Sequence, residues 1–99
     1  MIPTQLPPGL TCYKRTAEFT IETVPQALLS THSVKPGVWA LLRVLRGHVR
    51  YCRDGETADS MIVAPGRAAV IEPDMPHHVE LLDADSTFFV EFHRPEDAA

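Results

Sequence analysis

Five histidines and a set of carboxylates supply the candidate chemistry of this 99-residue chain. His77 follows the proline-punctuated turn 73–76 and begins an apolar segment, whereas His32 lies shortly before a Pro-Gly pair at 36–37. If adjacent strands bring these two imidazoles together, they can hold one metal ion, because neutral imidazole is a common ligand for zinc, nickel and iron. The alternative is that both histidines are ordinary polar residues at strand ends.

A third ligand is needed for a mononuclear catalytic site, which typically has about three protein ligands and an open position. Strand alternation places Glu80 on the opposite face from His77, so only a bulge or the strand twist would bring it round. Glu91 shares a face with Phe89 and His93, where a carboxylate is costly unless it is paired. The candidates for the third ligand are therefore Glu80, Glu91 and His93, and strand parity gives Glu91 a better claim than Glu80. Trp39 begins a strand and either lines a pocket mouth or belongs to the core.

Other function classes have little support in the sequence. The formal net charge is -4 and basic residues do not cluster, so we expect no nucleic-acid partner. An apolar run of membrane-spanning length is absent, and the first residues do not resemble an export signal, which predicts a cytoplasmic protein with no membrane association. Cys12 and Cys52 do not form a Cys-x-x-Cys pair and are expected to be thiols. Nucleophile-elbow, phosphate-loop and dinucleotide motifs are missing, so whether the protein is an enzyme stays open.

Nine prolines and five glycines divide the chain into short segments that are rich in β-branched and aromatic residues. This pattern predicts an all-β sandwich or barrel in one domain spanning residues 1–99. Residues 1–10 are expected to form an extended arm and residues 95–99 a loose tail. Strands are predicted at 27–32, 38–45, 48–53, 60–64, 67–71, 77–82 and 87–93, with one or two more within 11–22.

Two sets of motifs resemble known families. The run from Gly66 through Glu72, Pro73 and Pro76 to His77 resembles the second motif of the cupin superfamily, and Gly47 matches the glycine that ends the first motif. Ala40 stands where that first motif has a glutamate. A narrower likeness combines Val24-Pro25-Gln26, His32, Lys35-x-Gly37-x-Trp39 and Glu72-Pro73-x-x-x-His77-x-Val79-Glu80. It is similar to the small cupin-like domain of tellurite-resistance proteins, found at the N-terminus of some TehB proteins and alone in YeaR-like proteins.

The resemblance implies a cupin-type β-barrel, a double-stranded β-helix of jelly-roll type, that pairs into a homodimer. It also implies a site in which His32, His77 and Glu80 are the ligands. Such a set suits a divalent zinc, nickel, iron or manganese ion without choosing among them, and Trp39 and Glu91 are expected to line the pocket. Methyl transfer is not implied, because no glycine-rich cofactor loop is present. The expected function is a stress-related domain that binds a metal or small ligand. The alternatives are a metal-dependent oxygenase or isomerase and a metal-free binding or structural dimer.

Overall fold

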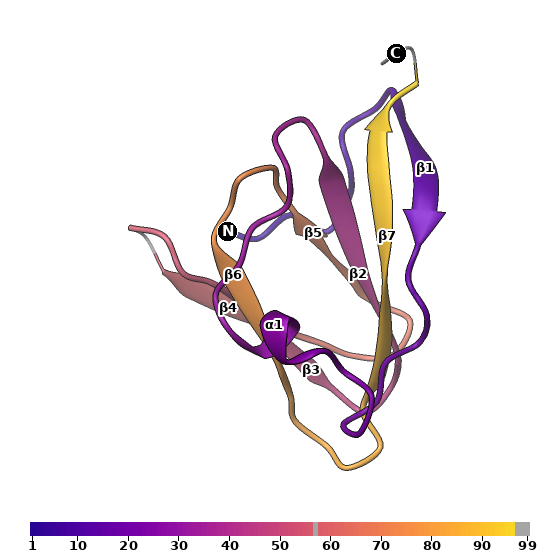
Figure 1. The fold of residues 1–99 in the computed structure, drawn as a ribbon, viewed down its shortest axis with the longest axis vertical. Coiled ribbons are helices and arrows are strands. Elements are labelled where there is room, and N and C mark those ends of the chain that lie inside the picture. Colours follow the sequence, from indigo (N-terminus) through magenta and orange to yellow (C-terminus); the bar gives the residue numbers. More distant parts are fainter. Residues whose placement is uncertain (57, 97–99) are drawn as a thin grey trace.

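The computed structural model describes residues 1–56 and 58–96. In these residues the chain forms seven strands and one short helix (Figure 1). In chain order they are β1 (Leu10–Arg15), α1 (Gln26–Leu29), β2 (Trp39–Arg46), β3 (Val49–Arg53), β4 (Asp59–Val63), β5 (Ala68–Ile71), β6 (His77–Leu81) and β7 (Thr87–Pro95). The predicted all-β class is confirmed, and the strands predicted from residue 38 onward begin and end within two residues of those observed.

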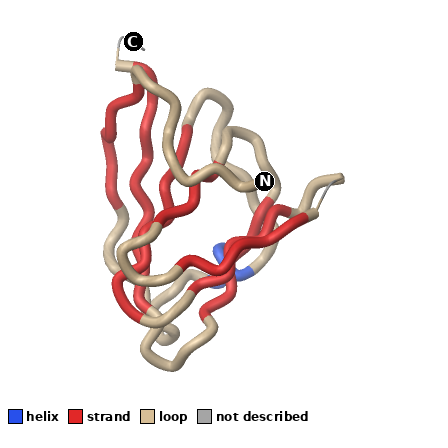
Figure 2. Tube along the Cα trace, turned by 180° about the vertical axis from the view of Figure 1, so that it is seen from behind, coloured by secondary structure: helices blue, strands red, loops and turns tan. Residues whose placement is uncertain are grey.

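The strands form two antiparallel sheets, which Figure 2 shows from behind as bands of strand joined by loops. One sheet has the order β1-β7-β2-β5 and the other has the order β4-β3-β6. In the described residues no strand joins one sheet to the other, so the closed barrel expected from the sequence is corrected to two open, facing sheets. The sheets end at short edge strands, and single residues bond to two of these edges: Pro3 at β5 and His32 at β6.

A single apolar core lies between the sheets. Alternate residues of each strand point into it, as the two-residue period of a strand requires. The fully buried members include Leu42 of β2, Tyr51 of β3 and Phe88 of β7. The next residues along each strand point the other way, so polar side chains lie on the outer faces of both sheets. On the larger sheet this face also includes the buried apolar residues Leu41, Val70 and Phe89. This division separates the two groups of titratable side chains discussed below.

The strand predicted at 27–32 is wrong. The structure forms the helix α1 at Gln26–Leu29 and a single bridge residue at His32. Ala and Leu favour a helical turn once Pro25 has set the backbone at the entry to it. These residues therefore form a helical turn instead of the strand that the short apolar run predicted. As a result, the chain reaches the edge of β6 as one extended residue rather than as a strand.

Described residues near both ends of the chain contact the rest of the fold. Ile2 of the expected arm is buried in the core, and the Val70 amide of β5 donates a 2.9 Å hydrogen bond to the Pro3 carbonyl. At the other end β7 runs through Pro95, so the expected loose tail begins inside a strand. Residues 97–99 of that tail lie outside the described residues. In the described part of the chain, no helix is long and apolar enough to span a membrane.

Gly47 makes the turn between β2 and β3 in the left-handed region, with φ of 61°. A Cβ atom added there would lie 2.7 Å from Ser86 Oγ and 2.9 Å from Ser86 Cα. Ser86 is fully buried, and its hydroxyl donates to the His48 carbonyl at 2.7 Å and accepts from the Asp83 amide at 3.0 Å. The turn therefore needs glycine both for its conformation and for its contact with the β6–β7 loop.

Candidate functional site

His32 and His77 form the centre of the candidate site. Each donates its backbone amide to the carbonyl of the other, at 2.9 Å from His32 and 2.8 Å from His77. This bridge joins the segment after α1 to the first residue of β6 and places the two imidazole rings with their centroids 4.1 Å apart and their planes tilted by 58°. The predicted approach of these two histidines is therefore what the structure shows.

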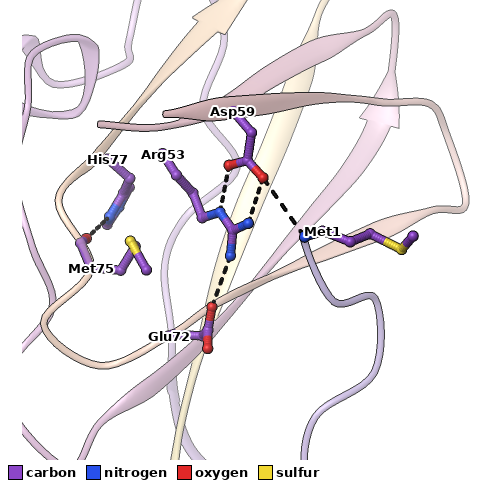
Figure 3. Close-up of polar contacts among 6 residues, drawn as sticks. All are labelled: Met1, Arg53, Asp59, Glu72, Met75 and His77. Atoms are coloured by element: carbon purple, nitrogen blue, oxygen red, sulfur yellow. Dashed lines mark hydrogen bonds and ion pairs between the residues drawn. The ribbon is translucent and has the colours of Figure 1, made fainter. Parts of the chain in front are cut away.

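Backbone carbonyls orient both rings through their Nδ1 atoms. His77 Nδ1 lies 2.8 Å from the Met75 carbonyl, as drawn in Figure 3, and His32 Nδ1 lies 3.0 Å from the Ser30 carbonyl. A carbonyl can only accept, so each neutral ring carries its proton on Nδ1 and has a lone pair on Nε2. Among the described residues, neither Nε2 atom has a hydrogen-bond partner. Both are left able to accept a ligand proton or coordinate a metal ion.

A pocket of about 560 Å³ opens between the sheets beside these rings. Its volume lies in the range of small-molecule sites, about 300–1,000 Å³. Apolar side chains from both sheets and from the α1 region make up most of its wall, namely Phe19, Leu28, Val34, Val38, Leu42, Ile71, Val79, Phe88, Val90 and Phe92. The pocket can therefore bury a largely apolar molecule with the imidazoles as a polar contact.

The charged residues of the pocket are all basic. The whole chain has two lysines, Lys14 and Lys35, and both line this pocket. In the described part of the chain, no aspartate or glutamate lines it, although the formal net charge is -4. The local charge thus has the opposite sign from that of the protein as a whole, which favours an anionic ligand.

Glu80 does not join the histidine pair. It projects from the outer face of β6, where Oε1 lies 2.7 Å from Arg50 Nη1 and Oε2 lies 3.5 Å from His78 Nε2. Because Glu80 is three residues after His77 on a regular strand, it lies on the opposite face, and it is not part of the ligand set that the family resemblance implied. In the described residues, no Cys, Asp, Glu or further His completes a three-ligand cluster with His32 and His77.

Trp39 and Glu91, which were expected to line the pocket, lie on the opposite face of the larger sheet. Their neighbours Ala40 and Val90 line the pocket instead. Glu91 Oε2 pairs with Arg43 Nε at 3.3 Å, and Glu91 Oε1 lies 3.3 Å from His93 Nε2. The Glu91 carboxylate, which was expected to be costly on this face unless paired, is thus paired locally.

An ion cluster that was not predicted from the sequence surrounds Arg53, as Figure 3 shows. Arg53 Nε and Nη2 donate to the two carboxylate oxygens of Asp59 at 2.6 and 2.5 Å, and Nη1 donates to Glu72 at 3.0 Å. The Met1 amino group lies 4.0 Å from Asp59. The arginine side chain is 12% exposed, and its hydrogen bonds hold the pKa of Asp59 below the ordinary range. Arg53 lies opposite His77 in the β3–β6 pairing, so this cluster closes the core beside the site.

The pKa values of the neighbouring histidines His77 and His78 of β6 are expected to lie on opposite sides of the ordinary value of about 6.5. Burial lowers the pKa of His77, whereas the hydrogen bond to Asp54 raises the pKa of His78. NMR titration of the ring Hε1 protons in the presence of EDTA, assigned with His77→Gln and His78→Gln, should show this split.

The two histidines change the stability of the protein with pH in different ways. Unfolding lets His77 take up a proton, so the contribution of His77 to stability falls as pH drops below about 6.5. The contribution of His78 is complete below that pH and is lost as pH rises through its higher folded pKa. The free energy of unfolding can be measured by urea titration across this pH range. His77→Gln should reduce its dependence on pH below about 6.5, and His78→Gln should reduce its dependence on pH above that value. Equal titration of both rings would contradict this account.

Comparisons with known proteins extend over most of the chain. The TehB-like domain family matches residues 14–90. The probable S-adenosyl-L-methionine-dependent methyltransferase TehB of Haemophilus influenzae (strain 10810) is 31% identical over 80 residues, which is 77% of this chain and 28% of TehB. The uncharacterized protein YeaR of Escherichia coli (strain K12) is 25% identical over 96 residues, covering 89% of this chain and 81% of YeaR.

Solved structures agree with these matches. The crystal structure of TehB from Haemophilus influenzae aligns with a TM-score of 0.80 and 29% identity, over 89% of this chain and 32% of that one. A crystal structure of a protein from Escherichia coli (strain K12) aligns with a TM-score of 0.86 over 94% of this chain and 98% of that one. At 24% identity, the second likeness shows the fold alone.

Proposed function

The chain belongs to the TehB-like domain family, and we propose that it is a ligand-binding domain whose pocket holds a small, largely apolar organic anion. The observation that carries the proposal is the pocket beside His32 and His77, which has an apolar wall and no acidic residue among its described lining. The apolar part of the ligand would occupy the space between the sheets. Its acidic group would meet Lys14 or Lys35, and a donor group would meet a free imidazole Nε2.

This chain spans 28% of the length of the TehB relatives that it matches, so the activity of those whole proteins is not carried over to it. The relatives are named as probable methyltransferases, whereas binding is proposed here from the pocket of the matched domain. We further propose that the two facing sheets are an open variant of the cupin-type fold, with the pocket in the usual place for a ligand. Homodimer formation and a cytoplasmic location stay predictions.

A divalent metal ion on His32 and His77 is the second candidate occupant. The support for it is the pair of Nδ1 hydrogen bonds, which leave both Nε2 lone pairs available for zinc, nickel, iron or manganese. Two imidazoles without a carboxylate would leave positions open for water or a substrate oxygen, as a metal-dependent oxygenase or isomerase requires. This candidate predicts that binding depends on both histidines and needs neither lysine.

The two candidates are separated by titrating the protein with 1-anilinonaphthalene-8-sulfonate, an apolar anionic fluorophore, and displacing the probe with decanoate. We expect decanoate to compete and tellurite, an oxyanion with no apolar part, not to compete. Lys14→Glu combined with Lys35→Glu should weaken decanoate binding by about tenfold at low salt.

The matched control is Arg46→Glu combined with Arg67→Glu, which makes the same charge change at exposed residues that do not line this pocket. Equal weakening in both double variants, or the absence of displaceable probe, would contradict the organic-anion proposal. The loss of one equivalent of bound nickel or zinc in His32→Gln and in His77→Gln, with no loss in the lysine variant, would favour the metal instead.

A further inference from the structure

A second group of ligand-type side chains lies on the outer face of the three-stranded sheet, away from the pocket. Cys52 of β3 and His78 of β6 are directly paired residues, and Glu80 lies two residues further along β6. One ligand atom from each of the three, a sulfur, a ring nitrogen and a carboxylate oxygen, lies within 4.8 Å of the other two. Sulfur, imidazole and carboxylate together form a donor set that suits zinc.

The ring of His78 is oriented by a carboxylate. Its Nδ1 lies 2.7 Å from Asp54 Oδ2, and the hydroxyl of Thr31 donates to the same oxygen at 3.0 Å. A metal-bound histidine commonly donates its second ring N–H to a carboxylate, which fixes the tautomer and the ring plane. Asp54 therefore directs His78 Nε2 toward Glu80.

The distance from His78 Nε2 to Glu80 Oε2 fits a shared metal ion. At 3.5 Å it is long for a direct hydrogen bond. It matches the separation of about 3.3–3.8 Å between ligands that lie 2.0–2.3 Å from one tetrahedral zinc ion. Arg50 contacts only Oε1 of Glu80, at 2.7 Å, so the oxygen that faces His78 is not the one that the guanidinium holds.

We propose that Cys52, His78 and Glu80 bind one divalent metal ion, of which zinc fits the donor set, on this face. Asp54 is the residue that positions His78. Metal binding replaces the thiol proton of Cys52 and any proton on His78 Nε2, and these protons go to solvent. The thiolate and the Glu80 carboxylate balance the two charges of the ion. A fourth position stays open to water. The site is independent of the pocket, because His78 and Glu80 point to the opposite side of β6 from His77.

The group formed by Cys12, Glu91 and His93 is the nearest rival. Its cysteine is exposed, and its histidine has no orienting carboxylate on the second nitrogen: among the described residues, His93 Nδ1 is buried without a partner. The geometry therefore favours Cys52 as the metal-binding thiol. Because each group contains one cysteine, two single substitutions separate them.

The test is Co²⁺ titration of the full chain, purified without a metal-affinity tag and followed by absorption. We expect one equivalent of Co²⁺ to give the near-ultraviolet band of a thiolate–cobalt bond, and Zn²⁺ to remove it. Cys52→Ser and His78→Gln should lose the band, whereas Cys12→Ser and His32→Gln should keep it. Asp54→Asn should weaken binding by about 10–100-fold.

A second measurement keeps the proposal testable if Cys52→Ser fails to fold. In the Cys12→Ser protein, Cys52 is the one remaining thiol, so its labelling by iodoacetamide should slow when Zn²⁺ is added and recover with EDTA. A band that survives Cys52→Ser, a band lost in Cys12→Ser, or labelling indifferent to Zn²⁺ would overturn the proposal. None of these results bears on decanoate binding in the pocket.

Discussion

Gly47→Ala is expected to lower the free energy of unfolding by about 3 kcal/mol. A residue with a Cβ atom costs about 1–2 kcal/mol in the left-handed conformation that Gly47 adopts. The new methyl group would also lie 2.7–2.9 Å from Ser86, and such overpacking typically costs about 1–3 kcal/mol. Relief by movement of Ser86 would break the hydrogen bonds by which this buried hydroxyl holds the β6–β7 loop. Urea unfolding followed by circular dichroism measures the loss.

Gly66→Ala is the matched control for this substitution. Gly66 also has a positive φ, of 80°, but an added Cβ atom there would meet no other atom within 4 Å. We expect it to cost only the conformational penalty, about 1–2 kcal/mol. If the two glycine variants lost equal stability, the contact with Ser86 would not be the cause.

The second large effect is expected at Arg53, for which Arg53→Met should lower the free energy of unfolding by about 2 kcal/mol. Hydrogen bonds to charged groups are worth about 1.5–3 kcal/mol, and removal of a largely buried arginine leaves its carboxylate partners uncompensated. We expect less than the full cost of a buried pair, because Asp59 and Glu72 are about one-third exposed and water can reach them.

Arg50→Met provides the comparison on the same strand. Arg50 makes one ion pair with Glu80, and both side chains are more than one-third exposed, so its loss should change stability little. Urea titrations of both variants at neutral pH give the contrast. Similar losses for Arg53 and Arg50 would show that the cluster in Figure 3 does not hold the sheets together.

Much of the fold could be predicted because its signals are local. Proline and glycine turns and the alternation of apolar residues located the strands from residue 38 onward. The helix α1 was missed because Ala27, Leu28 and Leu29 suit a short strand as well as a helical turn, and tertiary context chose between them. Whether the sheets close into a barrel depends on edges far apart in sequence, which no local pattern reports.

The site was predictable only in part for the same reason. The approach of His32 and His77 followed from turns and from a family pattern, but the pocket wall comes from both sheets and could not be assembled from spacing. Alternation alone placed Glu80 on the other face of β6, and the structure agrees with that rule. The Arg53 cluster joins residues from β3, β4 and the turn after β5, so nothing in the order of the chain pointed to it.

The hydrogen bond between Val70 and Pro3 has a consequence for association between molecules. The outer edge of a sheet is a template on which a strand from another chain can add, and this is a common route to aggregation. Here the Pro3 carbonyl accepts the hydrogen bond of the Val70 amide on the edge of β5. Pro3 itself has no amide N–H that could donate to a further strand. Anchored by Ile2 in the core, this short segment therefore protects the larger sheet against polymerisation through that edge.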